Sequence, residues 1–383
     1  MNAPSLNPGG LLRSASAAAE AMTSLLRETL EIESPSSDST GVAALGRRLE
    51  RELLPLGLAV EQVPVEGGGP LLCARSRGAS APVMLLGHLD TVWPLGTLSR
   101  RPLRVEGDLL YGPGAFDMKA GLVIIVFALR LLRERGDLPP VTVFLTPLEE
   151  TGVLPYQGRM EAEMKASAAV LDFEPAWPGG AVKTSRKGSG SFTLRAFGRA
   201  SHAGADLSKG ANAIREMARQ VERLSGLTDV EKGVSVNVGV IRGGISSNVV
   251  PDRAEAEIDV RYTHLGDGEA LVAAVRRLEP SVPGVRLELN GGLHYPPMER
   301  GPHVVRVFEA ARDVARAMGL DLEEVGTGGA SEASFAAALG VPTLDGLGAD
   351  GDGAHAENEH VRLSSLPERA ALAAGLITRL ARA

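Results

Sequence analysis

Two adjacent glutamates, Glu149 and Glu150, stand in the stretch LTPLEETG directly after an apolar run at 141–146. Successive side chains of an extended chain point to opposite faces. Two carboxylates placed in this way can do different jobs, such as binding a cation and moving a proton. The alternative interpretation is an acidic turn exposed to solvent. The positions of the other acids and of the histidines distinguish between these two interpretations.

A histidine and an aspartate follow another apolar run, in MLLGHLDTVWP. Their spacing of two puts His88 and Asp90 on one face of a strand. Ligands of open α/β sheets bind beyond the carboxyl ends of the strands, and an imidazole beside a carboxylate is common in metal sites. The pair alone does not distinguish a metal site from a structural role.

Further acids and a histidine occupy comparable positions. Asp117 lies on a turn with Gly and Pro before a predicted helix, where an aspartate could simply cap that helix. Asp172 and Glu174 follow a third apolar run, again two residues apart. His355 lies in the glycine-rich segment GDGAHAENEH, which also contains Glu357, Glu359 and His360.

These groups would form one cluster if the strand ends meet at one edge of a sheet. Clustered carboxylates raise one another's pKa values unless cations compensate their charge. Two divalent metal ions about 3.5–4 Å apart, bridged by one carboxylate, would provide that compensation. Imidazole and carboxylate ligands without a thiolate favour Zn2+, with Co2+ or Mn2+ as alternatives.

The elements that would position these groups alternate between strands and helices. Short apolar runs at 81–87, 141–146 and 168–173 are typical of buried strands in a sheet covered on both faces. Helices are predicted over 11–33 and 120–135. This alternation predicts an α/β fold.

The pattern changes at about residue 188. Strands with alternating apolar residues are then predicted at 190–198, 234–241, 253–262 and 285–290, and helices at 210–226 and 269–279. The order strand–helix–strand–strand–helix–strand resembles a ferredoxin-like α+β domain. Helix–strand alternation returns from about 297. A discontinuous catalytic domain is therefore expected over 1–187 and 297–383, with 188–296 inserted in it.

At these residues the chain resembles the two-metal aminopeptidase-like family of glutamate carboxypeptidases, aminoacylases and succinyl-diaminopimelate desuccinylases. Within that family it looks most like the carboxypeptidase G-type glutamate carboxypeptidases. The motifs that carry the resemblance, over about residues 80 to 362, are GHLDTVWP, GPGAFDMKAG, EETG, DFEP, RASHAGA, ISSNVVP, DVRY, GGASEASFAAALGVPTLDGLG and GAHAENEHV. The resemblance implies an aminopeptidase-like (phosphorylase/hydrolase-like) three-layer α/β catalytic domain. It also implies an inserted ferredoxin-like domain that serves as a lid and in dimerisation.

The resemblance implies a complete set of ligands for two metal ions. His88 and Glu174 would hold one ion, and Glu150 and His355 the other, with Asp117 bridging both. An acid at position 174, where other branches have His or Cys, favours the peptidase and aminoacylase branches over the carbamoylase and auxin-conjugate branches.

Two further residues have implied roles in the chemistry. Glu149 would be the general base that takes a proton from the attacking water and returns it to the leaving amine. Asp90 would orient His88. The peptide bond between Asp117 and Met118 is expected to be cis, a costly geometry for a residue other than proline.

The resemblance also gives the inserted domain a role. His202 would reach into the active site of a partner subunit and stabilise the tetrahedral oxyanion, so a homodimer formed through this domain is expected. Asn248 and Arg261 would bind the free carboxylate of the substrate, the arginine through a bidentate pair. Four other histidines are interpreted as surface or loop residues: His264, His294, His303 and His360.

Three positions depart from the family pattern. Leu148 stands where an acid commonly precedes the pair of glutamates, and Glu332 stands where an aspartate is frequent after GGxS. The segment 290–297, NGGLHYPP, lacks an arginine that the G-type enzymes have near the end of the lid. The missing arginine concerns specificity for glutamate and leaves the metal chemistry untouched.

Composition restricts the class of protein. The 383 residues carry a net charge of −7 and show no basic stripe, which argues against non-specific binding of nucleic acid or acidic membranes. No run approaches the roughly 18 apolar residues of a membrane span, and no signal-peptide pattern opens the sequence. A cytoplasmic protein is therefore expected. The single cysteine, Cys73, lies in an apolar run and is interpreted as a core residue.

These observations predict a homodimeric, metal-dependent hydrolase that cleaves the amide bond to a C-terminal amino acid with a free carboxylate. Its substrate would be a small peptide or an N-acyl amino acid. An aminoacylase or N-acyl-amino-acid deacylase is the alternative, because the lid arginine is missing and the surroundings of Leu148 and Trp93 are apolar. A catalytically silent binding or scaffold protein on the same fold is an alternative of another class, against which the complete ligand set and Glu149 argue.

Overall fold

The computed structural model describes residues 8–78, 80–136 and 138–382, which form two compact units. Unit 1 comprises the chain up to Ser185, Arg300–Gly326 and the chain from Ser331, whereas unit 2 comprises Arg186–Glu299 and Thr327–Ala330. The short return of the chain to unit 2 at 327–330 has no counterpart in the division expected from the sequence. Residues 1–7, part of the stretch in which no signal peptide was found, lie outside the described residues.

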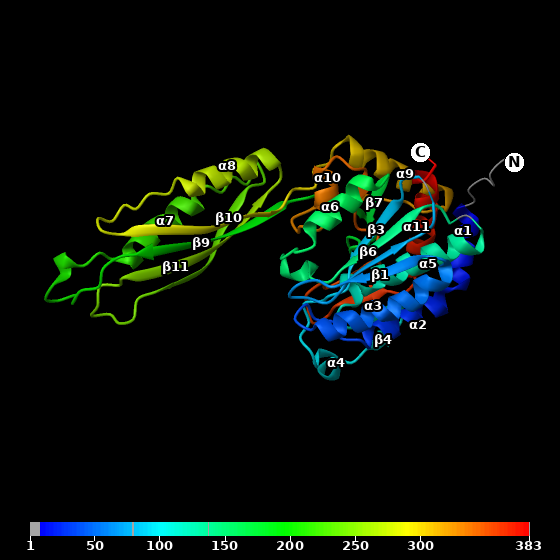
Figure 1. The fold of residues 1–383 in the computed structure, drawn as a ribbon, viewed down its shortest axis with the longest axis horizontal. Helices are drawn as coiled ribbons and strands as arrows, with labels where there is room; N and C mark the ends of the chain where they lie inside the picture. Colours follow the sequence, from blue (N-terminus) through cyan, green and yellow to red (C-terminus); the bar gives the residue numbers. More distant parts are fainter. Residues whose placement is uncertain (1–7, 79, 137, 383) are drawn as a thin grey trace. The chain divides into compact units, whose positions relative to one another are not determined.

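Unit 1 is built on a six-stranded mixed sheet (Figure 1). In spatial order its strands are β1 (Ala59–Val63), β2 (Leu71–Arg75), β6 (Val141–Thr146), β3 (Val83–His88), β7 (Ala169–Asp172) and β14 (Thr343–Leu344). The last four are parallel to one another, whereas β1 and β2 pair antiparallel. Every residue of β3 and β6 is buried, as expected for central strands covered on both faces.

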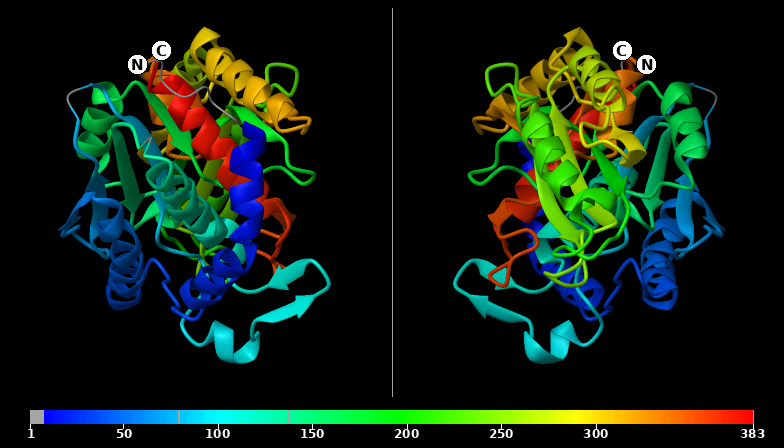
Figure 2. Two further views of the ribbon diagram at one scale, coloured as in Figure 1. Left: turned by 90° about the vertical axis from the view of Figure 1, so that its right-hand side faces the viewer. Right: turned by 90° about the vertical axis from the view of Figure 1, so that its left-hand side faces the viewer.

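Helices cover both faces of this sheet. The connection from β3 to β6 contains α5 (Ala120–Glu134) and moves toward β2, whereas the connection from β6 to β7 contains α6 (Gln157–Ala166) and moves back past β3. Crossovers between parallel strands are right-handed, so steps in opposite directions put α5 and α6 on opposite faces. α5 packs against α11 (Ser365–Leu380), as the left view of Figure 2 shows, and α6 packs against α10 (Ala333–Ala338). The expected three-layer α/β fold is confirmed.

The other elements outside unit 2 are shorter or lie at the edges. The helices are α1 (Pro8–Ala17), α2 (Ala19–Leu30), α3 (Ser39–Leu53), α4 (Thr97–Arg100) and α9 (Pro302–Ala317). The turns are η1 (Leu54–Leu56), η2 (Ala115–Lys119) and η3 (Glu149–Thr151). The strands are β4 (Arg104–Glu106), β5 (Leu109–Tyr111), β8 (Val182–Arg186), β13 (Glu324–Thr327), β15 (Gly351–Asp352) and β16 (His360–Arg362).

One expectation about the helices is wrong. A single helix was expected over 11–33, but α1 and α2 are separate and meet at Ala18, whose backbone is not helical. α1 packs mainly against α11, whereas α2 contacts α5, η2 and α11. The two halves therefore differ in their packing partners, a tertiary effect that periodicity does not reveal.

Unit 2 is an antiparallel sheet with two helices. Its elements in chain order are β9 (Gly188–Phe197), η4 (Leu207–Lys209), α7 (Ala213–Ser225), β10 (Ser235–Gly243), β11 (Arg253–Tyr262), α8 (Leu265–Arg276) and β12 (Arg286–Tyr295). The strand order β10-β11-β9-β12 is that of a ferredoxin-like domain, as expected. Its own core includes Phe192, Met217 and Tyr262.

Two smaller expectations can be compared with the structure. Cys73 is buried in β2, and burial raises the pKa of its thiol to about 11, so it is confirmed as a core residue. Among the described residues, no helix has both the length and the apolar character needed to cross a membrane.

A glycine in the first turn of α5 allows this helix to approach the end of β7. A Cβ atom on Gly121 would lie 2.1 Å from the carbonyl oxygen of Phe173, the residue before Glu174. We predict that Gly121→Ala lowers the free energy of unfolding by about 1–3 kcal/mol, because a methyl group there forces the backbone apart. Urea denaturation measures this change.

Gly158→Ala in α6 is the matched control. A Cβ atom on Gly158 meets no atom within 4 Å, so alanine should raise the free energy of unfolding by up to about 1 kcal/mol. Equal effects of the two substitutions would contradict the role given to Gly121.

Candidate active site

His88 is the last residue of β3, and Asp90 follows two residues later. Nδ1 of His88 donates a hydrogen bond to the backbone carbonyl of Asp90 (2.9 Å), which leaves Nε2 to face the other site residues. The carboxylate of Asp90 lies farther from that ring, 3.5 Å from Nδ1. Instead it accepts hydrogen bonds from the backbone N–H groups of Glu149 and Glu150 (3.2 Å each) and from the Ser36 hydroxyl (2.7 Å). Asp90 therefore orients His88 chiefly through its backbone and holds the pair of glutamates with its side chain.

Asp117 lies in the irregular segment η2 before α5. The alternative that it caps this helix is wrong, because Lys119 occupies the N-cap position and the backbone of Asp117 is not helical. Oδ1 of Asp117 lies 3.1 Å from Nε2 of His88, and Oδ2 lies 3.3 Å from Nε2 of His355. The peptide bond to Met118 is cis, as expected. One carboxylate thus faces two imidazoles through its two oxygens.

Glu149 and Glu150 begin the turn η3, directly beyond β6. The explanation that they diverge because the chain is extended is wrong, since a 3-10 turn rotates successive side chains by about 120°. They nevertheless belong to different groups of donor atoms. Glu149 lies with His88 and Glu174, and Glu150 lies with His88 and Asp117, the donor atoms of each group being within 4.8 Å of one another.

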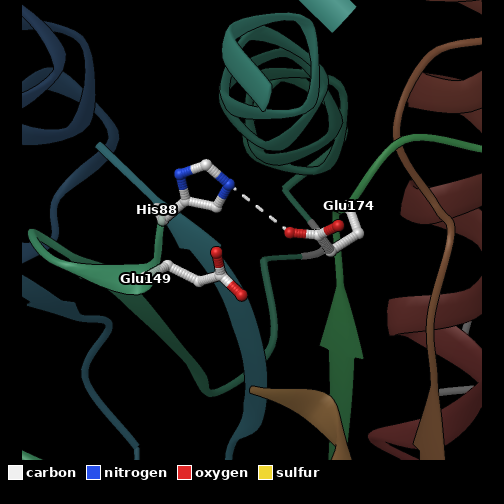
Figure 3. A group of neighbouring side chains, drawn as sticks. All are labelled: His88, Glu149 and Glu174. Carbon is white, nitrogen blue, oxygen red and sulfur yellow. Dashed lines mark ion pairs between the residues drawn. The ribbon is translucent and has the colours of Figure 1, made fainter. Parts of the chain in front are cut away.

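Glu174 lies two residues beyond the end of β7 and faces the end of the neighbouring β3. Its Oε1 is 3.4 Å from Nε2 of His88. Figure 3 shows the imidazole of His88 directed toward Glu174, with the carboxylate of Glu149 beside them. Asp172, the last residue of β7, is also buried but belongs to neither group of donors among the described residues.

His355 approaches the cluster from the loop between β15 and β16. Its Nε2 lies 3.1 Å from Oε2 of Glu150 and 3.3 Å from Oδ2 of Asp117. It is the one non-glycine residue with a positive φ (61°) among those that the structure describes. Sparsely populated backbone conformations of this kind concentrate at functional sites.

The charges of this cluster are strongly coupled. Burial lowers the pKa of His88, but its contacts with Asp117, Asp90 and Glu174 outweigh burial and raise that pKa well above its usual value. Hydrogen bonds with Asp117 and Glu150 raise the pKa of His355 to about 11. The carboxylates around the two imidazoles thus favour the protonated, positively charged form of each ring.

The pKa values of the acids depend on the balance between burial and their contacts with the imidazoles. Burial raises the pKa of Glu149 well above its usual value, and the charge of Glu174 raises it further. Burial also raises the pKa of Glu150. For Asp117 the hydrogen bonds with His355 and His88 outweigh burial and hold the pKa far below its usual value.

The donor set fits divalent metal ions. Two imidazoles and four carboxylates meet from the ends of three strands, the segment η2 and one loop, and no thiolate is among them. Oε1 of Glu150 is buried and has no hydrogen-bond partner among the described residues. A buried carboxylate oxygen without a partner is costly, and a cation would satisfy it. These residues could therefore hold two ions.

Three further residues with predicted roles lie in unit 2. His202 and Asn248 are close together, because His202 pairs with Val249 in a β-bridge and the N–H of Ala203 donates to the carbonyl of Asn248 (2.9 Å). Nδ1 of His202 accepts hydrogen bonds from Gly204 and Ala205 (3.1 Å each), which orients the exposed ring.

Arg261 does not lie with Asn248. It lies near the C-terminal end of β11, and its guanidinium group donates two hydrogen bonds of 2.9 Å to the carboxylate of Asp259. Eight residues of strand separate it from Arg253, roughly 27 Å at about 3.4 Å per residue. Within one chain, Asn248 and Arg261 therefore lie too far apart to bind the same carboxylate.

One positioning residue was not assigned a role from the sequence. Glu359 is buried, and its carboxylate accepts hydrogen bonds from the backbone N–H groups of Gly114, Phe116 and Asp117 and from the indole of Trp93. It therefore holds the segment that presents Asp117. The only signal in the sequence is its place four residues after His355 in the motif GAHAENEH.

The remaining histidines lie outside the two donor groups found among the described residues. Three of them have another contact: His264 with Glu299, His294 with Ser191, and His360 with the ring of Tyr111.

Comparison with known proteins gives the chain its family. The model of peptidase family M20/M25/M40 matches residues 84–379. Carboxypeptidase G2 from Pseudomonas sp. strain RS-16 is 32% identical over 371 residues, covering 94% of this chain and 89% of the relative. A succinyl-diaminopimelate desuccinylase from Thiobacillus denitrificans is 31% identical over 326 residues, covering 79% of this chain and 81% of that enzyme.

The fold is similar to that of solved structures. The crystal structure of aminopeptidase PepT from Bacillus cereus superposes with a TM-score of 0.78 at 20% identity, covering 95% of this chain and 99% of that one. The chain therefore belongs to peptidase family M20/M25/M40 and is a metal-dependent hydrolase.

Proposed function

We propose that the protein hydrolyses the amide bond between an acyl or peptidyl group and a C-terminal amino acid with a free carboxylate, as glutamate carboxypeptidases do. The observation that carries this proposal is the position of Asp117, whose two oxygens face His88 and His355 at 3.1 and 3.3 Å. A carboxylate placed between two imidazoles could bridge a pair of metal ions.

Two divalent ions, with Zn2+ as the first choice, would divide the donors between them. His88 and Glu174 would hold one ion, Glu150 and His355 the other, and Asp117 both. When bound, the ions would polarise the scissile carbonyl group and make the attacking water more acidic. The contacts of Glu174 with His88 (3.4 Å) and of Glu150 with His355 (3.1 Å) support this division.

Glu149 would move the proton. It lies in the group with His88 and Glu174, while its N–H is held by Asp90. From this position its carboxylate would accept a proton from the attacking water and donate it to the nitrogen of the leaving amino acid. Neither step changes the covalent structure of the protein.

The substrate carboxylate and the oxyanion would be bound by residues of unit 2. Because Asn248 and Arg261 lie near opposite ends of β11, we propose that they come from two copies of the chain in a homodimer. His202, close to Asn248, would then stabilise the oxyanion in the site of the partner subunit. Arg261 would release Asp259 and form a bidentate ion pair with the substrate carboxylate instead.

A deacylase acting on N-acyl amino acids is the second candidate. The segment 290–297 contains no arginine that could help to select a glutamate side chain. The similarity to a succinyl-diaminopimelate desuccinylase supports the same candidate. Both candidates use the same metal cluster and the same general base, and they differ in the acyl group and the amino acid released.

Hydrolysis tests the proposed function directly. We expect the protein loaded with Zn2+ to hydrolyse an N-acyl glutamate or a folate-like substrate, measured as release of the free amino acid. A panel varied on both sides of the bond then separates the carboxypeptidase from the deacylase. A thorough treatment with chelator should abolish turnover, and re-addition of Zn2+ should restore it. Turnover that survives removal of the metal would refute the mechanism.

The pair of glutamates can be separated by mutation. Glu149→Gln should keep two metal ions and lose turnover by about 10²–10⁴-fold, the usual contribution of a general base. Glu150→Gln should lose metal, because it replaces a ligand oxygen by an amide. Metal content per chain, measured by atomic emission, distinguishes the two variants, and the reverse pattern would overturn the division of roles.

Glu359 offers a test of how Asp117 is held. Glu359→Gln replaces one acceptor oxygen by an NH2 group that faces backbone N–H donors, so the segment of Asp117 should loosen. We expect a loss of about 10–100-fold in Zn2+ affinity, as for other residues that orient metal ligands. Glu357→Gln is the control, since Glu357 is exposed in the same loop. Similar affinities of the two variants would argue against this role.

A further inference from the structure

Glu332 is a buried carboxylate outside the groups of metal donors, and it directly precedes α10. Its Oε2 accepts a hydrogen bond from the hydroxyl of Thr146 (2.9 Å), and its Oε1 accepts one from the hydroxyl of Tyr156 (2.8 Å). Glu332, Thr146 and Tyr156 are 2%, 0% and 5% exposed, respectively. Each oxygen of this carboxylate thus has its own donor, shielded from solvent.

The two donors stand at the two ends of one segment. Thr146 is the last residue of β6, and Tyr156 directly precedes α6. Between them the chain forms only the turn η3, which carries Glu149 and Glu150. The middle of this segment is held by Asp90, as described above, and Glu332 holds both of its ends.

We propose that Glu332 is a positioning residue for Glu149 and Glu150, acting through Thr146 and Tyr156. This inference rests on the proposed function of the two glutamates as general base and metal ligand. A movement at either end of the segment moves both carboxylates, and displacements of about 1 Å are enough to reduce catalysis strongly. Glu332 belongs to neither group of metal donors found among the described residues, so its proposed effect is indirect.

The length of the side chain explains why a glutamate serves at this position, where an aspartate is frequent in the resembling family. An aspartate carboxylate would lie about one carbon–carbon bond, roughly 1.5 Å, closer to the backbone. The hydroxyl groups of Thr146 and Tyr156 come from two different elements and cannot both follow such a shift. Aspartate at 332 would therefore lose at least one of the two contacts.

The first test removes one hydroxyl group. Tyr156→Phe keeps the ring and deletes only the donor to Glu332. We expect the affinity of the metal-free protein for Zn2+, measured against a competing chelator, or kcat to fall about 10-fold or more, with KM nearly unchanged. The titration requires no substrate, so it decides this inference even if no N-acyl amino acid is hydrolysed.

Thr378→Val is the matched control. It deletes a buried hydroxyl of α11 that donates to the carbonyl of Ala374 (2.9 Å), so it destabilises unit 1 without touching the segment. Zn2+ affinity and kcat of this variant should stay close to those of the wild type. Comparing the two variants, together with their melting temperatures, separates positioning from a general loss of stability.

A double-mutant cycle tests the connection between the residues. If Glu332 acts through Tyr156, the substitution Tyr156→Phe should have a much smaller effect in the Glu332→Ala background, which has no carboxylate, than in the wild type. Additive effects would overturn the proposal. The proposal would also be overturned if Tyr156→Phe and Thr378→Val had the same Zn2+ affinity and the same kcat. Should the Glu332→Ala chain fail to fold, the comparison of Tyr156→Phe with Thr378→Val still tests the proposal.

Discussion

The burial of several carboxylates at one edge of the central sheet is the constraint on which the rest of unit 1 depends. Asp117, Glu149, Glu150 and Glu174 meet there around His88, in a place where each would otherwise favour its neutral form. The structure meets this constraint by placing imidazoles between the acids, and one oxygen of Glu150 has no partner among the described residues. Divalent cations would complete the same balance of charge.

A second set of buried carboxylates holds the first set in place. Asp90 accepts hydrogen bonds from the N–H groups of Glu149 and Glu150, and Glu359 accepts one from the N–H group of Asp117. Glu332 accepts hydrogen bonds from two hydroxyl groups at the two ends of the segment that carries the pair of glutamates. A carboxyl group offers two oxygens, each of which can accept hydrogen bonds. Irregular segments can therefore be held rigidly at the strand ends, where neither helix nor sheet provides partners for the backbone.

Much of the architecture could be predicted from local patterns. β6 and β11 have the bounds expected from the sequence, 141–146 and 253–262, because an apolar run and a strict alternation are bounded by turn residues. The separation of α1 from α2 at Ala18 could not be predicted, since both halves continue one amphipathic pattern. The two halves differ in the elements that they mainly pack against, and no local pattern records such partners.

For the site, the sequence by itself determined which residues could do the chemistry, because the acids and histidines follow predicted strands and recur in motifs of a known family. Only the tertiary structure decided how they are held. The turn at Glu149, the positive φ of His355 and the contacts of Glu359 with the segment of Asp117 depend on pieces of chain far apart in sequence. Adjacent residues report local conformation, whereas a hydrogen bond that spans more than two hundred residues exists only once the chain has folded.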